Sequence, residues 1–246
     1  MSNNTTEHPF AEFIRILGKG KNGSRPLTQD EANRAMRMIL AGEVEEIQLG
    51  AFLMLMRVKE ETAEELAGFV LAVRETLPNI ASQTADLDWS AYAGKRRHLP
   101  WFILSSLLLS ENDIKVLMHG SAAHSASRVF AQDMLPLFSL AKANSFAEAE
   151  GQLQVRNFAY LSLEQFCPAL NSMIHLRNLM GLRSPVHTLV RLVNPLNAPY
   201  SIQGIFHPGY RPVHQEAALL LKQAHMTVIK GEGGETERNP DMQCLA

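Results

Sequence analysis

Apolar side chains recur at helical spacing through the first third of the chain. In residues 9–18 one helical face carries Phe10, Phe13, Ile14 and Leu17. Two capping boxes, in which a threonine precedes a glutamate by three residues, predict the starts of two further helices. They are Thr28 with Glu31, and Thr62 with Glu65. Between these two lies "EEIQLGAFLMLMRVK", which is apolar on nearly every face and so predicts a buried helix. The pattern predicts an all-helical unit that ends at Pro78.

Beyond Pro78, short apolar runs alternate with amphipathic stretches. The runs "DIKVLMHG", "FAYLSL", "YSIQGIF" and "MTVIKG" predict strands, and "SASRVFAQDMLPLFSLA", "EQFCPALNSMIHLRNLMG" and "PVHQEAALLLKQAH" predict helices. Such alternation is typical of an α/β unit with a largely parallel sheet. We therefore expect an α/β fold with a separate all-helical domain. The expected boundaries are 1–78 for the helical domain, completed by about 164–182, and 83–160 with 185–246 for the α/β domain.

Composition indicates a globular protein of near-neutral net charge and does not indicate a particular partner. The chain has 246 residues, 46% of them apolar, and a formal net charge of −2, so an anion site must come from local clustering. Two isolated cysteines, Cys167 and Cys244, form neither a disulfide framework nor a zinc site. The N-terminus lacks the pattern of a signal peptide, and no apolar run is long enough to span a membrane. A cytoplasmic protein without a membrane partner is expected.

The segment "AYAGKRRHLPWF", residues 91–102, concentrates positive charge. Lys95, Arg96 and Arg97 follow Gly94 directly, and Trp101 and Phe102 stand close by. A basic run is commonly a solvated surface. It also suits a phosphate-rich partner, on whose bases an exposed aromatic side chain can stack.

A second constellation follows the predicted strand "KVLMHGS", which delivers His119, Gly120 and Ser121 to a turn. Ser121, Ser125 and Ser127 surround the start of the next predicted helix. Hydroxyl groups and free amides at a helix N-terminus suit a phosphate, although serines there also serve as ordinary caps.

Charged residues of the C-terminal half supply further candidates. Arg177, Arg183 and Arg191 can bind carboxylates or phosphates through two parallel hydrogen bonds, or form surface ion pairs. In "KGEGGETERNP" an acidic, glycine-rich turn follows a strand, and its carboxylates are candidates for holding Mg²⁺ through water.

Together these stretches resemble glycosyltransferase family 3, which has the nucleoside-phosphorylase type II fold, and within it the anthranilate phosphoribosyltransferases. The resemblance spans nearly the whole chain. "EEIQLGAFLMLMRVKEETAEELAGF" is similar to the family's first domain, and "KVLMHGS" to its K-x-x-K-H-G-N-R segment. "LRNLMGLRSPVHTLVRLVNPLNAPYSIQGIF" is similar to V-R-x-x-L-G-x-R-T-x-F-N-x-L-G-P-L-x-N-P and the strand after it. The resemblance implies a helical domain beside an α/β domain whose C-terminal part is short, because the family continues further.

The family's site residues carry over only in part. Its diphosphate loop, D-x-V-G-T-G-G-D, aligns with "DWSAYAGK", where Asp88 and Gly94 match and Lys95 replaces the loop aspartate. His119, Gly120 and Arg177 match, the last being the arginine that contacts the aromatic acid. Asn-Arg becomes Ser121-Ala122, and the acidic metal pair aligns with Gly234-Glu235. The candidate phosphate- or substrate-binding residues are therefore Gly94, His119, Gly120 and Arg177 from the resemblance, and Lys95, Arg96, Arg97 and Ser121 from the basic run and the serine-rich turn. The resemblance also gives Glu235 as a metal ligand.

Two functions remain open on this basis. One is a phosphoribosyltransferase-like protein that binds phosphoribosyl diphosphate or another phosphorylated ligand, uses Mg²⁺ if active, and has an unknown acceptor. The other is a non-catalytic relative that binds single-stranded nucleic acid or another polyanion through a basic interdomain cleft. The lost glycines matter because Tyr92 and Ala93 obstruct the approach of backbone amides to phosphates. Ordinary anthranilate phosphoribosyl transfer is therefore expected to be absent or very weak. A homodimer through the helical domain is expected in either case.

Overall fold

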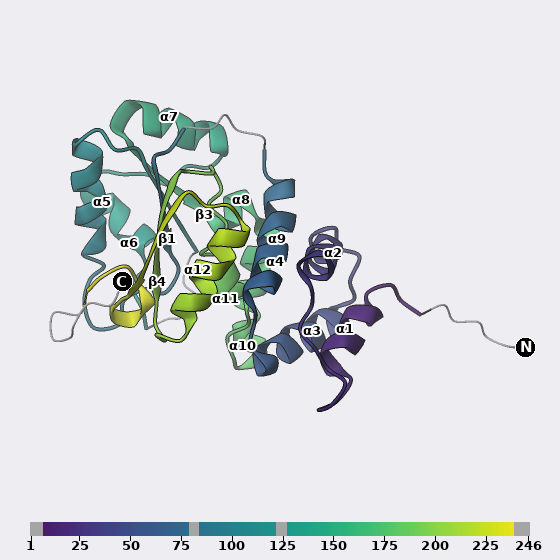
Figure 1. Ribbon diagram of the computed structural model, residues 1–246. Helices are drawn as coiled ribbons and strands as arrows, with labels where there is room; N and C mark the ends of the chain where they lie inside the picture. Colours follow the sequence, from purple (N-terminus) through teal and green to yellow (C-terminus); the bar gives the residue numbers. More distant parts are fainter. Residues whose placement is uncertain (1–6, 79–83, 122–126, 239–246) are drawn as a thin grey trace, which may run out of the picture.

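A helical bundle packs against a five-stranded parallel sheet (Figure 1). The computed structural model describes residues 7–78, 84–121 and 127–238. The architecture agrees with the expected α/β fold with a helical N-terminal domain. None of the described helices is long and apolar enough to cross a membrane.

The bundle is formed by α1 (Ala11–Gly18), α2 (Gln29–Leu40), α3 (Glu46–Lys59) and α4 (Ala63–Thr76). Both predicted capping boxes are present, at the starts of α2 and α4. The prediction of a buried α3 is wrong. Phe52, Leu53 and Met56 are buried, but Ile47 is 83% exposed and Val58 79% exposed. These two lie eleven residues apart, which is three helical turns, so they share one exposed face.

The sheet has the strand order β3-β2-β1-β4-β5, and every neighbouring pair is parallel. Its strands are β1 (Leu87–Ala91), β2 (Val116–Gly120), β3 (Phe158–Ser162), β4 (Tyr200–Ile205) and β5 (His225–Lys230). Four of them match the predicted strands, whereas β1 was not predicted. The chain order reverses beside β1, where the strand after β3 returns to pair on its other side. In open parallel sheets such a point places a crevice at the carboxyl ends of the strands.

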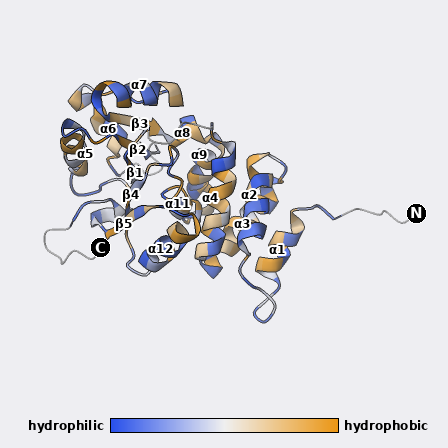
Figure 2. Cartoon of the chain, turned by 45° about the horizontal axis from the view of Figure 1, so that its top comes forward, coloured by the Kyte–Doolittle hydropathy of each residue, from blue (hydrophilic) through white to orange (hydrophobic). Residues whose placement is uncertain are grey.

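Helices cover both faces of the sheet and mark out two cores (Figure 2). Successive residues of a strand point to opposite faces, and β2 shows this clearly. Val116 and Met118 join the core beneath α5 (Phe102–Glu111) and α6 (Ala131–Met134). Leu117 joins the larger core that contains α7 (Phe146–Arg156), α12 (Tyr210–Leu220) and the bundle.

The bundle and the sheet share this larger core. Short helices continue it from the sheet side: α8 (Leu163–Phe166), α9 (Pro168–His175), α10 (Arg177–Met180) and α11 (Val186–Leu189). Helix α4 packs against both α11 and α12. Arg74 of α4 also donates from Nε to the carbonyl of Val193 at 2.7 Å. The bundle is therefore packed directly against the helices of the α/β part.

Two of the predicted helices differ from the structure. In the described part of the stretch 125–141, which starts at residue 127, helix begins only at Ala131, and Pro136 lies in a 3₁₀ turn, η1 (Leu135–Phe138). The stretch 164–181 is divided into α8, α9 and α10, because Cys167 is extended and Pro168 starts a new helix. Gly181, with φ of 70°, ends α10 as predicted.

Candidate functional site

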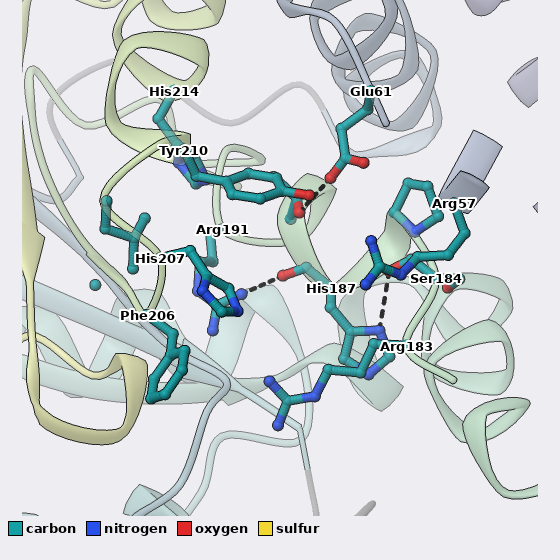
Figure 3. A pocket seen from close by; sticks show the side chains of 14 residues that line it. Arg57, Glu61, Arg183, Ser184, His187, Arg191, Phe206, His207, Tyr210 and His214 are labelled. Carbon is teal, nitrogen blue, oxygen red and sulfur yellow. Dashed lines mark hydrogen bonds between the residues drawn. The ribbon is translucent and has the colours of Figure 1, made fainter. Parts of the chain in front are cut away.

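A cavity of about 140 Å³ lies between the bundle and the carboxyl end of β4 (Figure 3). Side chains reach it from three directions: the end of α3 and the following loop, the segment around α11, and the turn that leads from β4 into α12. The six that matter most to its chemistry are Arg57, Glu61, Arg183, Ser184, Arg191 and His207. We call this cavity the interdomain cleft.

The sheet side of the interdomain cleft is cationic. Burial, and the nearby charges of Arg191, Arg128 and Arg177, lower the pKa of Arg183 to about 10. Burial also lowers the pKa of Arg191. Within the described part of the chain, no carboxylate lies in ion-pair distance of Arg183 or Arg191, so the surface ion pairs considered from sequence are not formed here. A bound anion would relieve this mutual repulsion.

The bundle side of the interdomain cleft carries one buried acid. Glu61 accepts a hydrogen bond from Thr188 Oγ1 at 2.6 Å, which joins the bundle to α11. Burial raises the pKa of Glu61. Glu61, Arg57, His207 and Tyr210 were not predicted as site residues. Their only sequence signal is position. Arg57 lies in the last turn of α3 and Glu61 in the loop after it, and His207 and Tyr210 lie between the end of β4 and the first turn of α12.

The turn after β1, residues 92–95, folds around an acid of the chain itself. Glu235 is 1% exposed, and its Oε1 accepts the amide N–H of Ala93 at 2.7 Å and that of Gly94 at 2.6 Å. Gly94 has φ of +64°, a conformation that favours glycine. The Glu235 carboxylate thus occupies the amides that the sequence comparison assigns to a phosphate.

Lys95 also meets acids of the 231–237 turn. Its ammonium is buried, pairs with Glu232, and lies 3.0 Å from Glu237 Oε1. The sequence left the basic run open as a solvated surface or as a patch for a phosphate-rich partner. Lys95 takes neither role, because its ammonium is buried against acids of the chain. Arg96, Arg97 and His98 are exposed. None of the three lines the interdomain cleft.

The two aromatic residues beside the basic run differ in solvent exposure. Phe102 is 2% exposed and belongs to the core beneath α5, whereas Trp101 is 54% exposed. Trp101 and its cationic neighbours Arg96 and Arg97 are therefore all accessible to a large partner.

His119 is buried inside the sheet rather than at its edge. Its Nε2 lies 3.1 Å from Asp88 Oδ1, and its Nδ1 lies 2.7 Å from the Tyr92 hydroxyl. Gly120 is needed for close packing, because a Cβ there would come within 2.3 Å of the Ala91 carbonyl. In this structure both residues organise the strand ends and expose no side chain to a ligand.

Ser121 and Arg177 take part in different contacts. Ser121 Oγ donates to Asn171 Oδ1 at 3.0 Å, which links the end of β2 to α9. Ser125 and Ala122 fall outside the described residues. Arg177 begins α10, and its charge contributes to lowering the pKa of Arg183. Arg177 thus belongs to the same cationic group as Arg183 and Arg191.

Glu235 is poorly placed to hold a metal ion. One of its oxygens already accepts two amide hydrogens, and the charges of Arg191 and Lys95 act on it. Over the described ranges, no three His, Cys, Asp or Glu side chains are grouped as a metal site would require. Glu235 does not fit Mg²⁺, because its Oε1 is occupied by two amide hydrogens and its surroundings are cationic.

Comparison with known proteins decides the family. Residues 11–77 match the family described as "Glycosyl transferase family, helical bundle domain". An uncharacterized protein of Aquifex aeolicus is 30% identical over 242 residues, which are 97% of this chain and 72% of that protein. The chain belongs to this glycosyl transferase family. Its anthranilate phosphoribosyltransferase-like fold is that expected from the sequence motifs.

Other family members resemble the chain at similar levels. YbiB of Escherichia coli, also uncharacterized, is 27% identical over 82% of this chain and 64% of its own length. The anthranilate phosphoribosyltransferase of Erythrobacter litoralis is 29% identical over 86% of this chain and 64% of its own. The chain thus spans about two thirds of the length of the relatives it matches.

Solved structures agree on the fold. The anthranilate phosphoribosyltransferase of Thermus thermophilus superposes with a TM-score of 0.78 at 23% identity, covering 93% of this chain and 68% of that one. The enzyme of Saccharomyces cerevisiae, solved in complex with PRPP and Mg, gives 0.75 at 17% identity, with 93% and 67% covered. At these identities the likeness establishes the architecture alone.

Proposed function

We propose that this protein binds a phosphorylated ligand of the phosphoribosyl diphosphate class in the interdomain cleft. The observation that carries the proposal is the pair Arg183 and Arg191, which face the cleft without a carboxylate partner among the described residues. Guanidinium groups suit phosphate and carboxylate oxygens through paired hydrogen bonds. Ser184 supports the proposal, since its buried Oγ lines the cleft and has no hydrogen-bond partner in the described chain.

Ordinary anthranilate phosphoribosyl transfer is proposed to be absent or very weak. Transfer from a diphosphate donor needs groups that stabilise the departing charge. Here the amides of Ala93 and Gly94 are taken by Glu235, and the Lys95 ammonium is taken by Glu232 and Glu237. Mg²⁺ could still accompany a bound diphosphate as part of the ligand, and the acceptor is unassigned. These contacts therefore support binding of a phosphorylated ligand more strongly than catalysis of phosphoribosyl transfer.

Calorimetric titration with phosphoribosyl diphosphate, with and without Mg²⁺, tests this proposal. Saturable binding is expected, and Arg191→Ala should weaken it at least about tenfold, since a hydrogen bond between charged groups contributes about 1.5 to 3 kcal/mol. Arg34→Ala is the matched control, because Arg34 lies on α2 and pairs with the exposed Glu12 at 2.9 Å. Equal affinity in the parent protein and Arg191→Ala, or no binding to the parent, would overturn the proposal.

A second candidate function is binding of single-stranded nucleic acid. Its supporting observation is the exposure of Arg96, Arg97 and Trp101 beside one another in the chain. Phosphates would meet the guanidinium groups and a base would stack on the indole. An oligonucleotide should quench Trp101 fluorescence in a Trp89→Phe background, with an affinity that falls steeply with salt. No quenching at low salt would remove this candidate.

We also propose a homodimer through the bundle. Ile47 and Val58 leave an apolar face of α3 open to solvent, and such a face suits burial against a second copy. Light scattering should give twice the chain mass of 27.4 kDa, and Ile47→Glu should halve the measured mass. A monomer mass for the parent protein would exclude the dimer.

We propose a cytoplasmic location as well. The free, buried thiol of Cys167 supports it, because thiols stay reduced in the cytoplasm.

A further inference from the structure

The turn after β1 has the geometry of an anion nest. Two successive amides, those of Ala93 and Gly94, converge on one oxygen at 2.7 and 2.6 Å. Gly94 contributes a positive φ, and successive N–H groups in such a turn form a concave anion site. The oxygen they hold is Glu235 Oε1, from the turn that follows β5. The nest is therefore filled by an anion that belongs to the chain.

The surroundings of the nest are built for negative charge. Arg128 donates to the carbonyls of Ala93 at 3.0 Å and Gly94 at 2.8 Å, which fixes the turn and brings a guanidinium close. The charges of Arg191 and Lys95 both stabilise the ionised form of Glu235. The other ionisable groups facing it are Arg183, Tyr160 of β3, and Glu232 and Glu237 of its own turn.

The second carboxylate oxygen of Glu235 does not take part in the nest. Glu235 Oε2 is buried and has no hydrogen-bond partner within the part of the chain that the structure describes. The carboxylate thus fills the nest with one oxygen, while its other oxygen accepts no hydrogen bond from the described residues. A tetrahedral oxyanion has more oxygens to offer to the same amides and to the neighbouring guanidinium groups.

We propose that Glu235 is a tethered competitor, which holds the amides of Ala93 and Gly94 against a small tetrahedral oxyanion such as phosphate or sulfate. The nest accepts the external anion when the carboxylate is neutralised or removed. This inference rests on the proposed function only for the class of ligand, because the nest is formed by the amides of Ala93 and Gly94, although the charge of Arg191 acts on both the nest and the interdomain cleft. It explains how the turn stays ordered without a bound phosphate.

Protonation is one way to weaken the competitor. Burial raises the pKa of Glu235 to about 7, against the opposing charge of Arg191 and the two amide hydrogen bonds. A neutral carboxyl group is a weaker acceptor than a carboxylate. External anions should therefore bind better as the pH falls below about 7. Sulfate is the suitable probe, because it does not change its own charge in this range.

Amide chemical shifts of Ala93 and Gly94, recorded by NMR during a sulfate titration at constant ionic strength, test the proposal. At about pH 8 the parent protein should show no saturable shift, whereas Glu235→Ala should show one, with at least about a tenfold gain in affinity. Glu235→Gln should lie between, since its amide oxygen still fits the nest without charge. In the parent, affinity should rise from about pH 8 to about pH 6, and in Glu235→Gln it should stay flat.

Glu164→Gln is the matched control, because Glu164 is exposed on α8, outside the nest and the cleft. It should behave as the parent does. If Glu235→Ala fails to fold, Glu235→Gln and the pH series still decide the matter. The proposal is overturned if the two amides ignore sulfate in both variants, or if the parent at about pH 8 binds sulfate as well as they do.

The outcome is independent of the test with phosphoribosyl diphosphate. Loss of that binding in Arg191→Ala reports on the interdomain cleft, whereas the Ala93 and Gly94 amides report on the nest. A sulfate response without diphosphate binding would reject the proposed function alone. Binding in the cleft with silent amides in the Glu235 variants would reject the tethered competitor alone.

Discussion

His119 Nε2 lies 3.1 Å from Asp88 Oδ1, and neither side chain is exposed to solvent. The pair joins β2 to β1, and the Tyr92 hydroxyl extends it at 2.7 Å from His119 Nδ1. A second contact reaches β4, because Ser201 Oγ donates to Asp88 Oδ2 at 3.2 Å. One carboxylate therefore serves three strands at the centre of the sheet, and burial makes each contact costly to lose.

Asp88→Ala should lower the free energy of unfolding by about 3 kcal/mol or more, because it removes a buried carboxylate that lies 3.1 Å from His119 Nε2 and accepts a hydrogen bond from Ser201 Oγ. Ser90→Ala is the matched control on the same strand. The Ser90 hydroxyl is buried and has no hydrogen-bond partner among the described residues, so its removal should cost little or even stabilise. Urea unfolding followed by circular dichroism measures both. Equal effects of the two changes would contradict the central role of Asp88.

Lys95 and the two arginines after it should respond differently to substitution. Lys95→Ala leaves Glu232 and Glu237 without the buried ammonium between them, so the free energy of unfolding should fall by about 3 kcal/mol. The double change Arg96→Ala/Arg97→Ala removes exposed charges and should shift stability by less than about 0.5 kcal/mol. Thermal or urea unfolding of both variants checks this. A neutral Lys95→Ala would show that the ammonium does not hold the two turns together.

Glu65 and Glu31 occupy equivalent capping positions but differ in burial. Glu65 is fully buried, and besides Thr62 N–H it accepts Leu27 N–H at 2.7 Å, which connects α4 to the segment before α2. Glu31 caps α2 near the surface and pairs with the exposed Arg25. Glu65→Ala should cost about 3 kcal/mol and Glu31→Ala about 1 kcal/mol. Similar losses in the two variants, measured by urea unfolding, would reject the extra role of Glu65.

His214 should make the protein less stable in mild acid. Burial lowers its pKa to about 3, and its Nδ1 lies 2.6 Å from Gln203 Oε1. The unfolded chain binds a proton near pH 6.5 while the folded chain does not, so this contribution is complete above about pH 6.5 and is lost as the pH falls. Between about pH 7 and pH 5 the loss is about 2 kcal/mol.

The comparison of parent and His214→Phe isolates this effect from the other histidines. Denaturant unfolding at the two pH values should give a smaller decrease for the variant than for the parent. Equal decreases would show that His214 takes up no additional proton on unfolding.

Much of the fold could be predicted from the sequence because its signals are local. The capping pairs Thr28–Glu31 and Thr62–Glu65 fix two helix starts through hydrogen bonds within one turn. Runs such as "YSIQGIF" and "MTVIKG" predict strands, and β4 and β5 confirm them. The strand β1 was not predicted because "LDWSA" carries the polar residues Asp88 and Ser90. Its polar groups are acceptable in the interior only because β2 and β4 lie on either side of it.

The chemistry of the site depended on contacts between residues far apart in the chain. From the sequence, Lys95 and Arg96 are both simply cationic residues of one basic run. In the structure the Lys95 ammonium is buried against Glu232 and Glu237, more than a hundred residues later in the chain. The same holds for Glu235, whose carboxylate meets the amides of Ala93 and Gly94 only because the turn after β5 passes the end of β4 and reaches the turn after β1. Charge type is a property of one residue, whereas exposure and partner are set by packing. The sequence therefore determined the family and the two-part architecture, and the tertiary structure decided which charges are left for a ligand.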